Sequence, residues 1–258
     1  MLLYMDIQNY LEKMKKIQEK LLEFLDYEYS VEENFQNLCI TLDNAKIGEN
    51  KHDLRSFLYL LQKISNNHYR ANDFFNKIDR ILQHFQNEIQ KDFSQSEIFD
   101  IFKSNKRILL FLFENKLIIM NEFIVKSILK AKYFQSKYFQ YFYPEIKPFV
   151  NKEWFQKCGR DNWSFIRNYI IERIKKGLPD NFNEKRKIGE NDDTICTFIQ
   201  KDLIEEFIIY VKKNDYSLKS TISPSIYETN SLLLKQTEIN LIEYAAFFGS
   251  IQIFKYLT

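Results

Sequence analysis

Three histidines, His52, His68 and His84, recur at a spacing of 16 residues, and this regularity raises the question of a metal site. Two metal ligands on one helix have to lie three or four residues apart, and none of these histidines has a cysteine or another histidine at that distance. We therefore expect ordinary or hydrogen-bonded histidines on helices, and no metal.

The three cysteines, Cys39, Cys158 and Cys196, are the candidate nucleophiles. A catalytic thiol needs a nearby base, which a sequence cannot show, but no local cysteine-protease signature surrounds any of them. Their odd number and wide spacing also argue against a disulfide framework and favour a reducing compartment. We expect structural thiols.

The sequence also lacks the motifs of other common catalytic and cofactor-binding sites. With five scattered glycines the chain has no phosphate-binding loop, dinucleotide fingerprint or nucleophile elbow. The adjacent Glu205 and Glu206 would point about 100° apart on a helix, so they are expected in solvent and not as a catalytic pair. Trp154 and Trp163 could stack a ligand or fill a core, and a core role is favoured. We expect no catalytic activity and no cofactor.

Charge argues against a polyanionic partner. The 37 Lys and Arg residues nearly cancel the 35 Asp and Glu residues, which leaves a formal net charge of +2. One compact basic run, Lys185 to Lys187, is too short for a typical nucleic-acid patch and is expected in a solvated loop. We therefore expect no nucleic-acid partner.

No membrane segment is expected either. Asp6 interrupts the apolar N-terminus before a signal peptide could form, and the longest apolar blocks, 108–113 and 117–120, are far shorter than a bilayer span. Together with the cysteine pattern, this predicts a cytoplasmic protein.

The elements that position these residues are predicted to be helices. Residues 1–143 contain one glycine, Gly48, and no proline, and these are the two residues that helices exclude. Apolar residues at steps of three and four predict a first helix with one buried stripe. Ser30 to Glu33 and Ser94 to Glu97 have the pattern of capping boxes at helix starts. The first stripe consists of Ile7, Leu11, Met14, Ile17, Leu21 and Leu25.

Short helices with short connections form antiparallel hairpins, and amphipathic hairpins bury their apolar faces by stacking. We therefore predict an all-α, solenoid-like fold. Residues 1–188 form a divergent helical region, with an irregular break near residues 143–162. The break opens a stretch, residues 143–179, in which prolines, glycines and tryptophans gather. Residues 189–258 form further hairpins, in which Asp193 caps one helix and Ser223-Pro224 begins another.

The segment from Asn240 to Leu257 resembles an ankyrin repeat. The resemblance implies that the alanines allow close approach of neighbouring repeats, that the glycine forms the turn, and that the second helix buries its apolar residues. The Thr-Pro-Leu-His start of the family is replaced by Asn240 to Glu243, although Asn240 can still cap the helix. The matching residues are Ala245, Ala246, Gly249, Ile253, Phe254 and Leu257.

A wider stretch, residues 187–249 together with residues 143–149, resembles protist ankyrin-repeat proteins that carry an associated domain of unknown function. The resemblance implies that a long repeat array follows such a region, whereas this chain stops at Thr258, inside its first clear repeat. We therefore expect Ile251, Phe254 and Tyr256 to be exposed and the chain to self-associate.

In ankyrin proteins, the two positions between the alanine pair and the glycine usually face the partner. The resemblance therefore offers Phe247 and Phe248 as partner contacts, and internal packing of the two rings is the alternative. The function we expect is recognition of an unknown protein partner without catalysis. The alternative is a structural N-terminal capping module for a longer repeat array, with no partner of its own.

Overall fold

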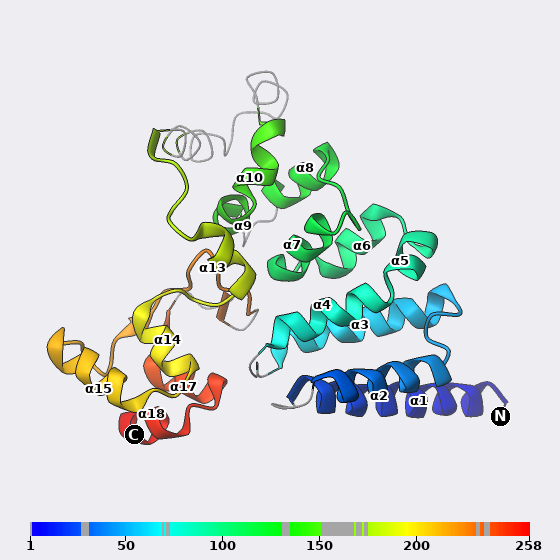
Figure 1. The fold of residues 1–258 in the computed structure, drawn as a ribbon, viewed down its shortest axis with the longest axis horizontal. Coiled ribbons are helices and arrows are strands. Elements are labelled where there is room, and N and C mark those ends of the chain that lie inside the picture. The colour runs from blue at the N-terminus through cyan, green and yellow to red at the C-terminus, as the bar shows by residue number, and fades with distance from the viewer. Residues whose placement is uncertain are drawn as a thin grey trace. The chain divides into compact units, whose positions relative to one another are not determined.

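The computed structural model describes residues 2–26, 31–68, 70, 73–130, 135–150, 168, 172, 175–230, 233–234 and 238–258 (Figure 1). These residues contain fifteen α-helices, and their only strands are two pairs of residues. The predicted all-α class is confirmed. The chain divides into two compact units, residues 1–108 and residues 109–258.

The first unit consists of six helices and the start of a seventh. α7 begins in this unit and ends in the second. The helices are α1 (Leu2–Asp26), α2 (Val31–Asn44), α3 (Lys51–Asn67), α4 (Phe74–His84), α5 (Gln86–Asp92), α6 (Gln95–Phe102) and α7 (Lys106–Glu114).

The predicted apolar stripe of α1 is buried only in the second half of the helix. Leu21 and Leu25 have no exposed surface, and the helix packs there against α2 and α4. By contrast, 51% of Ile7 and 61% of Leu11 is exposed. Helical spacing therefore gave the correct face of the helix but not the length over which that face is covered.

Two helices of the first unit begin at well-formed caps. Ser94 and Glu97 form the predicted capping box at the start of α6, and the side chain of Asn50 accepts the N–H of Asp53 at 2.9 Å at the start of α3. Ser30, of the other predicted capping box, lies outside the described residues.

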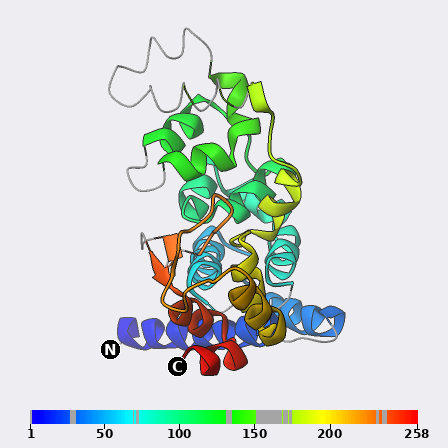
Figure 2. The ribbon, with the colours of Figure 1, turned by 90° about the vertical axis from the view of Figure 1, so that its left-hand side faces the viewer.

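The second unit holds the remaining helices and a small β-pair. Thr221 and Ile222 pair antiparallel with Asn240 and Ile239 (Figure 2). The elements are α8 (Glu122–Lys130), α9 (Gln135–Tyr141), α10 (Tyr143–Ile146), the 3-10 helix η1 (Lys147–Phe149), α13 (Phe182–Ile188), α14 (Thr194–Gln200), α15 (Ile204–Lys213), β1 (Thr221–Ile222), β2 (Ile239–Asn240), α17 (Leu241–Phe248) and α18 (Ile251–Leu257).

The predicted boundary at residues 188/189 lies inside this unit, at the end of α13, and stays a prediction. The predicted break near residues 143–162 begins with α10 and η1, and most of the rest of it lies outside the described residues, as do Cys158, Trp154 and Trp163. No helix in the described part of the chain is long and apolar enough to cross a membrane.

The basic run at residues 185–187 is helical, so the expected solvated loop is wrong. Arg186 is 5% exposed within α13 and bonds both carboxylate oxygens of Glu145 at 2.9 Å and the carbonyl of Tyr141 at 3.0 Å. A buried guanidinium needs such partners, and here it connects α13 to α9 and α10. A basic run in a sequence does not reveal which of its members is buried.

Ser223-Pro224 begins no helix, which corrects a second expectation. Residues 223–230 run as an irregular segment, and its polar residues from Glu228 to Asn230 are fully buried. The hydroxyl of Thr229 donates to the carbonyl of Gly189 at 2.7 Å, and the amide of Asn191 donates to the carbonyl of Ser223 at 3.1 Å. Tertiary hydrogen bonds take the place of a helix here.

Candidate functional site

Two helical hairpins pack together at the end of the chain, and they contain the residues predicted to recognise a partner. The first hairpin is α14–α15 and the second is α17–α18 (Figure 1). Their first helices contact each other, α14 against α17, and so do their second helices, α15 against α18. The two hairpins therefore stack in parallel.

The same turn closes both hairpins. Gly249 ends α17 in the left-handed region with φ 67°, as predicted, and Asp202 holds the corresponding position after α14 with φ 50°. Glycine is favoured in this region, and aspartate is one of the few other residues that adopt it readily. The closing bonds run from Ser250 N–H to Ala245 O (3.0 Å) and from Leu203 N–H to Phe198 O (2.9 Å).

Hydrogen bonds join the two turns. The carboxylate of Asp202 accepts the backbone N–H groups of Gln252 and Ile253 at 3.1 and 3.0 Å, so the first hairpin caps the start of α18. The hydroxyl of Ser250 donates in the opposite direction, to the carbonyl of Ile199. The sequence offered no indication of this link, because the residues lie about 50 positions apart.

Asn240 caps α17, as predicted. Its side chain accepts the N–H of Glu243 at 2.8 Å, and the carboxylate of Glu243 accepts the N–H of Asn240 at 3.1 Å. This reciprocal pair is a capping box. The backbone N–H groups of Asn240 and Glu243 therefore have hydrogen-bond acceptors, although the segment departs from the Thr-Pro-Leu-His pattern.

The predicted buried residues of this segment divide into two groups. Ala245 and Ile253 have no exposed surface, and Leu257 is half-buried against the hairpin core. Ala246 is exposed, and no neighbouring hairpin covers it in the described residues. Phe254 is 37% exposed, so it lies outside the buried face that the resemblance implies and agrees with the separate expectation that it is exposed. One alanine of the pair, and not both, is buried.

Phe248 packs internally. It is 5% exposed, and its ring lies 4.8 Å from that of Tyr244 and 5.0 Å from that of Phe247. Phe247 is partly buried against the same core. Internal packing, the alternative considered for these two rings, describes Phe248, and Phe247 keeps some surface for contact with a partner.

Polar groups in this core are inert. The side chain of Gln200 donates to the hydroxyl of Tyr244 at 2.8 Å. Burial raises the pKa of Tyr244 and that of the Cys196 thiol far above their ordinary values. Both groups are therefore protonated at neutral pH, and Cys196 is a structural thiol.

Four apolar side chains of the second helices are exposed. Ile209 on α15 is 64% exposed, and α18 carries Ile251 at 63%, Phe254 at 37% and Tyr256 at 38%. The prediction that the last three are exposed is confirmed. We call Ile209, Ile251, Phe254 and Tyr256 the outer-helix residues. Glu205 and Glu206 are exposed on α15, as predicted, with Lys212 and Lys213 at its other end.

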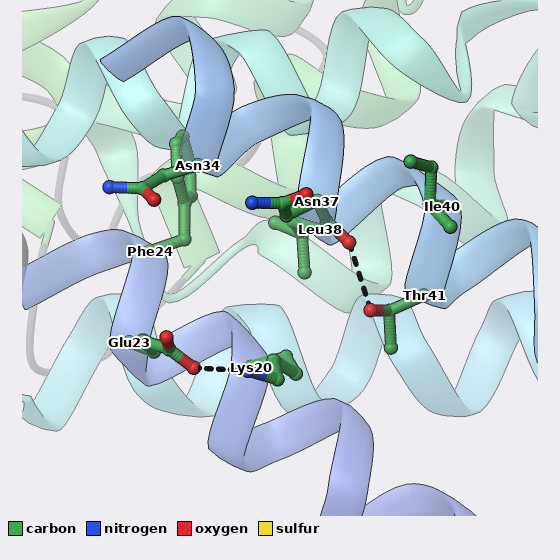
Figure 3. A pocket seen from close by; sticks show the side chains of 8 residues that line it. All are labelled: Lys20, Glu23, Phe24, Asn34, Asn37, Leu38, Ile40 and Thr41. Atoms are coloured by element: carbon green, nitrogen blue, oxygen red, sulfur yellow. Dashed lines mark hydrogen bonds and ion pairs between the residues drawn. The ribbon is translucent and has the colours of Figure 1, made fainter. Parts of the chain in front are cut away.

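A groove of about 300 Å³ lies between α1 and α2 in the first unit (Figure 3). Its polar groups bond locally, since Lys20 pairs with Glu23 at 2.6 Å and Thr41 donates to the carbonyl of Asn37 at 2.9 Å. Nothing in this lining supports catalysis. The lining residues are Lys20, Glu23, Phe24, Asn34, Asn37, Leu38, Ile40 and Thr41.

Each histidine lies close to an aspartate. His52 is 3.3 Å from Asp53, and His68 is 2.8 Å from Asp26. His84 lies between Asp43 and Cys39, 3.6 Å from the carboxylate of Asp43 and 3.7 Å from the sulfur of Cys39. In the described residues, no group of three histidine, cysteine, aspartate or glutamate side chains could hold a metal ion.

The chain was compared with known proteins. It matches no protein-family model, no curated protein and no solved structure.

Proposed function

We propose that the stacked hairpins α14–α15 and α17–α18 are a protein-recognition module of ankyrin type, without catalytic activity or a cofactor. The paired stacking of first helices and second helices supports this proposal, as do the left-handed turn at Gly249 and the capping box at Asn240. We place the module in the cytoplasm, because Cys39 and Cys196 are free thiols.

The observation that carries the proposal is the exposure of the outer-helix residues on two neighbouring helices. Aromatic residues such as Tyr256 are enriched in interfaces between proteins. Charged side chains of α15 lie nearby and can form the polar rim that interfaces require. The partner is a protein with a complementary apolar surface.

A capping role for a longer array is the second candidate. Ala246 is exposed beside the buried Ala245, and Phe254 shows 37% of its surface, so one face of the second hairpin offers small and apolar side chains to a further hairpin. Self-association through this face would cover the same residues. This role needs no external partner.

Affinity capture from the native cell tests the recognition role. The full chain carrying Ile209→Ser and Tyr256→Ser is compared with the unchanged chain, and a Leu11→Ser variant serves as a matched control, because Leu11 is an equally exposed apolar residue on α1. We expect the double variant to lose proteins that the other two chains retain. Identical captured sets in all three chains would refute the proposal, and capture of no protein by any of them would favour the capping role.

A further inference from the structure

Cys39 on α2 and His84 on α4 meet at the surface of the first unit. They are 45 positions apart in the sequence, and the Cys39 Sγ lies 3.7 Å from the His84 Nδ1. Asp43 lies four residues after Cys39, so both point to the same side of α2. Its carboxylate is 3.6 Å from the other ring nitrogen, Nε2. A thiol, an imidazole and a carboxylate therefore lie in series.

The carboxylate of Asp43 determines which ring nitrogen of His84 can accept the proton of the thiol. An anion beside Nε2 favours the tautomer with its proton on Nε2, which leaves the lone pair of Nδ1 directed at the thiol. The ring of His84 is held from two sides, 6.3 Å from the ring of Phe35 and 4.8 Å from that of Phe85. This order of nucleophile, base and orienting acid is the arrangement that activates a thiol.

Burial, followed by nearby carboxylates, keeps the thiol protonated at rest. Burial, Asp43 and Glu32 raise the pKa of Cys39, and the guanidinium of Arg80 opposes them. Arg80 pairs with Glu32 at 2.7 Å. Because few thiolates exist at neutral pH, reaction at Cys39 needs a base to take the proton as the bond to sulfur forms.

We propose that Cys39 is a modification site for soft carbon electrophiles, specifically α,β-unsaturated carbonyl compounds, with His84 as the base and Asp43 as the positioning residue. The sulfur forms a bond to the β-carbon while the π bond of the alkene opens. The thiol proton passes to Nδ1 of His84 and is then returned to the α-carbon. No oxidant and no leaving group take part, so atoms and electrons balance.

The chain contains its own reference thiol. Cys196 has no exposed surface, and its pKa is raised by burial within the hairpin core. Cys39 is only partly buried, so an electrophile has access to it. A faster reaction of Cys39 than of Cys196 shows that the site is accessible, and the His84 variant then tests the role of the base.

The probe is N-ethylmaleimide, an unsaturated imide, applied to the full chain at pH 7, with each cysteine followed by peptide mass spectrometry. We expect Cys39 to react at least tenfold faster than Cys196, and His84→Gln to slow Cys39 on the order of tenfold. His68→Gln is the matched control, since His68 lies beside an aspartate, Asp26, as His84 does, and none of its contacts within the described residues is with a thiol. It should leave the rate unchanged.

The pH dependence of the Cys39 reaction rate distinguishes a histidine that acts as a base from one that only supports the structure. In His84→Gln the rate should rise about tenfold per pH unit, as for a bare thiolate, and the unchanged chain should show a flatter profile. If His84→Gln fails to fold, Asp43→Asn decides, because the Asp43 side chain is 68% exposed and can be changed safely. Equal rates in the unchanged chain and in these variants, or a Cys39 no faster than Cys196, would overturn the proposal.

Discussion

The carboxylate of Asp202, in the turn of the first hairpin, accepts the backbone N–H of Ile253 in the second hairpin at 3.0 Å. Ser250 occupies the N-cap position of α18 but makes no capping bond itself, and its hydroxyl donates instead to the carbonyl of Ile199. Each turn therefore satisfies a backbone group of the other hairpin. These reciprocal hydrogen bonds hold the two hairpins at one relative position.

Asp202→Gly tests this link, because glycine retains the left-handed turn and removes the carboxylate. We expect the free energy of unfolding to fall by less than about 1 kcal/mol, because losing a helix cap costs about that much and glycine relieves part of the left-handed strain at this position. Asp202→Asn keeps an acceptor oxygen and should lie within about 0.5 kcal/mol of the unchanged chain. Urea unfolding measures both, and the amide of Ile253 should exchange faster with solvent in Asp202→Gly alone. An unchanged exchange rate would contradict the assignment.

Gly249→Ala tests the turn of the second hairpin. A side chain at φ 67° is strained, so we expect a loss of about 1 to 2 kcal/mol. Gly48→Ala is the control: Gly48 has no left-handed backbone, and its added Cβ would meet the Glu88 side chain at an ordinary 3.4 Å. Thermal unfolding should separate the two variants, and equal melting temperatures would show that the turn tolerates a side chain.

Features that depend on neighbouring residues could be predicted from the sequence. The capping box at Ser94, the helix cap at Asn240 and the left-handed turn at Gly249 follow from residue types within a few positions, and the structure confirms all three. The all-α class follows from helical spacing in the same way. Periodicity failed where burial depends on a distant element, as at Leu11, which keeps the predicted spacing and stays exposed.

Features that depend on distant residues could not be predicted. Arg186 is buried because Glu145, 41 positions earlier, pairs with it, and nothing near Arg186 in the sequence indicates this. The pairing of Cys39 with His84 depends in the same way on the packing of α2 and α4. Phe248 and Phe254 are both apolar residues of the hairpin α17–α18, and only the packing decides that the first is buried and the second exposed.

Phe248→Ser should therefore affect mainly stability, and Phe254→Ser mainly self-association. Phe248 lies in the core, so its loss should lower the free energy of unfolding by about 3 kcal/mol or more. Phe254→Ser should lower stability less, because 37% of Phe254 is exposed, and it should weaken self-association, because it removes exposed apolar surface from α18. Chemical unfolding and sedimentation measure the two effects. A chain that sediments as a monomer at high concentration before any change would refute self-association.

Glu97 gives the fold a dependence on pH. Its carboxylate accepts the N–H of Ser94 at 2.9 Å, lies 3.0 Å from the Lys51 amine and pairs with Arg55. These contacts, first the backbone bond from Ser94, lower its pKa from 4.5 to about 2. Because the folded pKa is the lower one, ionised Glu97 stabilises the fold above about pH 4.5, and this contribution is lost as the pH falls toward 2.

Glu97→Gln should isolate the charge, since glutamine can still accept the Ser94 N–H and complete the cap. We expect the variant to melt below the unchanged chain at pH 7 and the difference to vanish by about pH 2. Glu49→Gln is the control, because Glu49 forms a pair with Lys46 that is exposed and should contribute little at either pH. A difference for Glu97→Gln that stays the same at pH 2 would assign the loss to altered packing of the side chain instead of its charge.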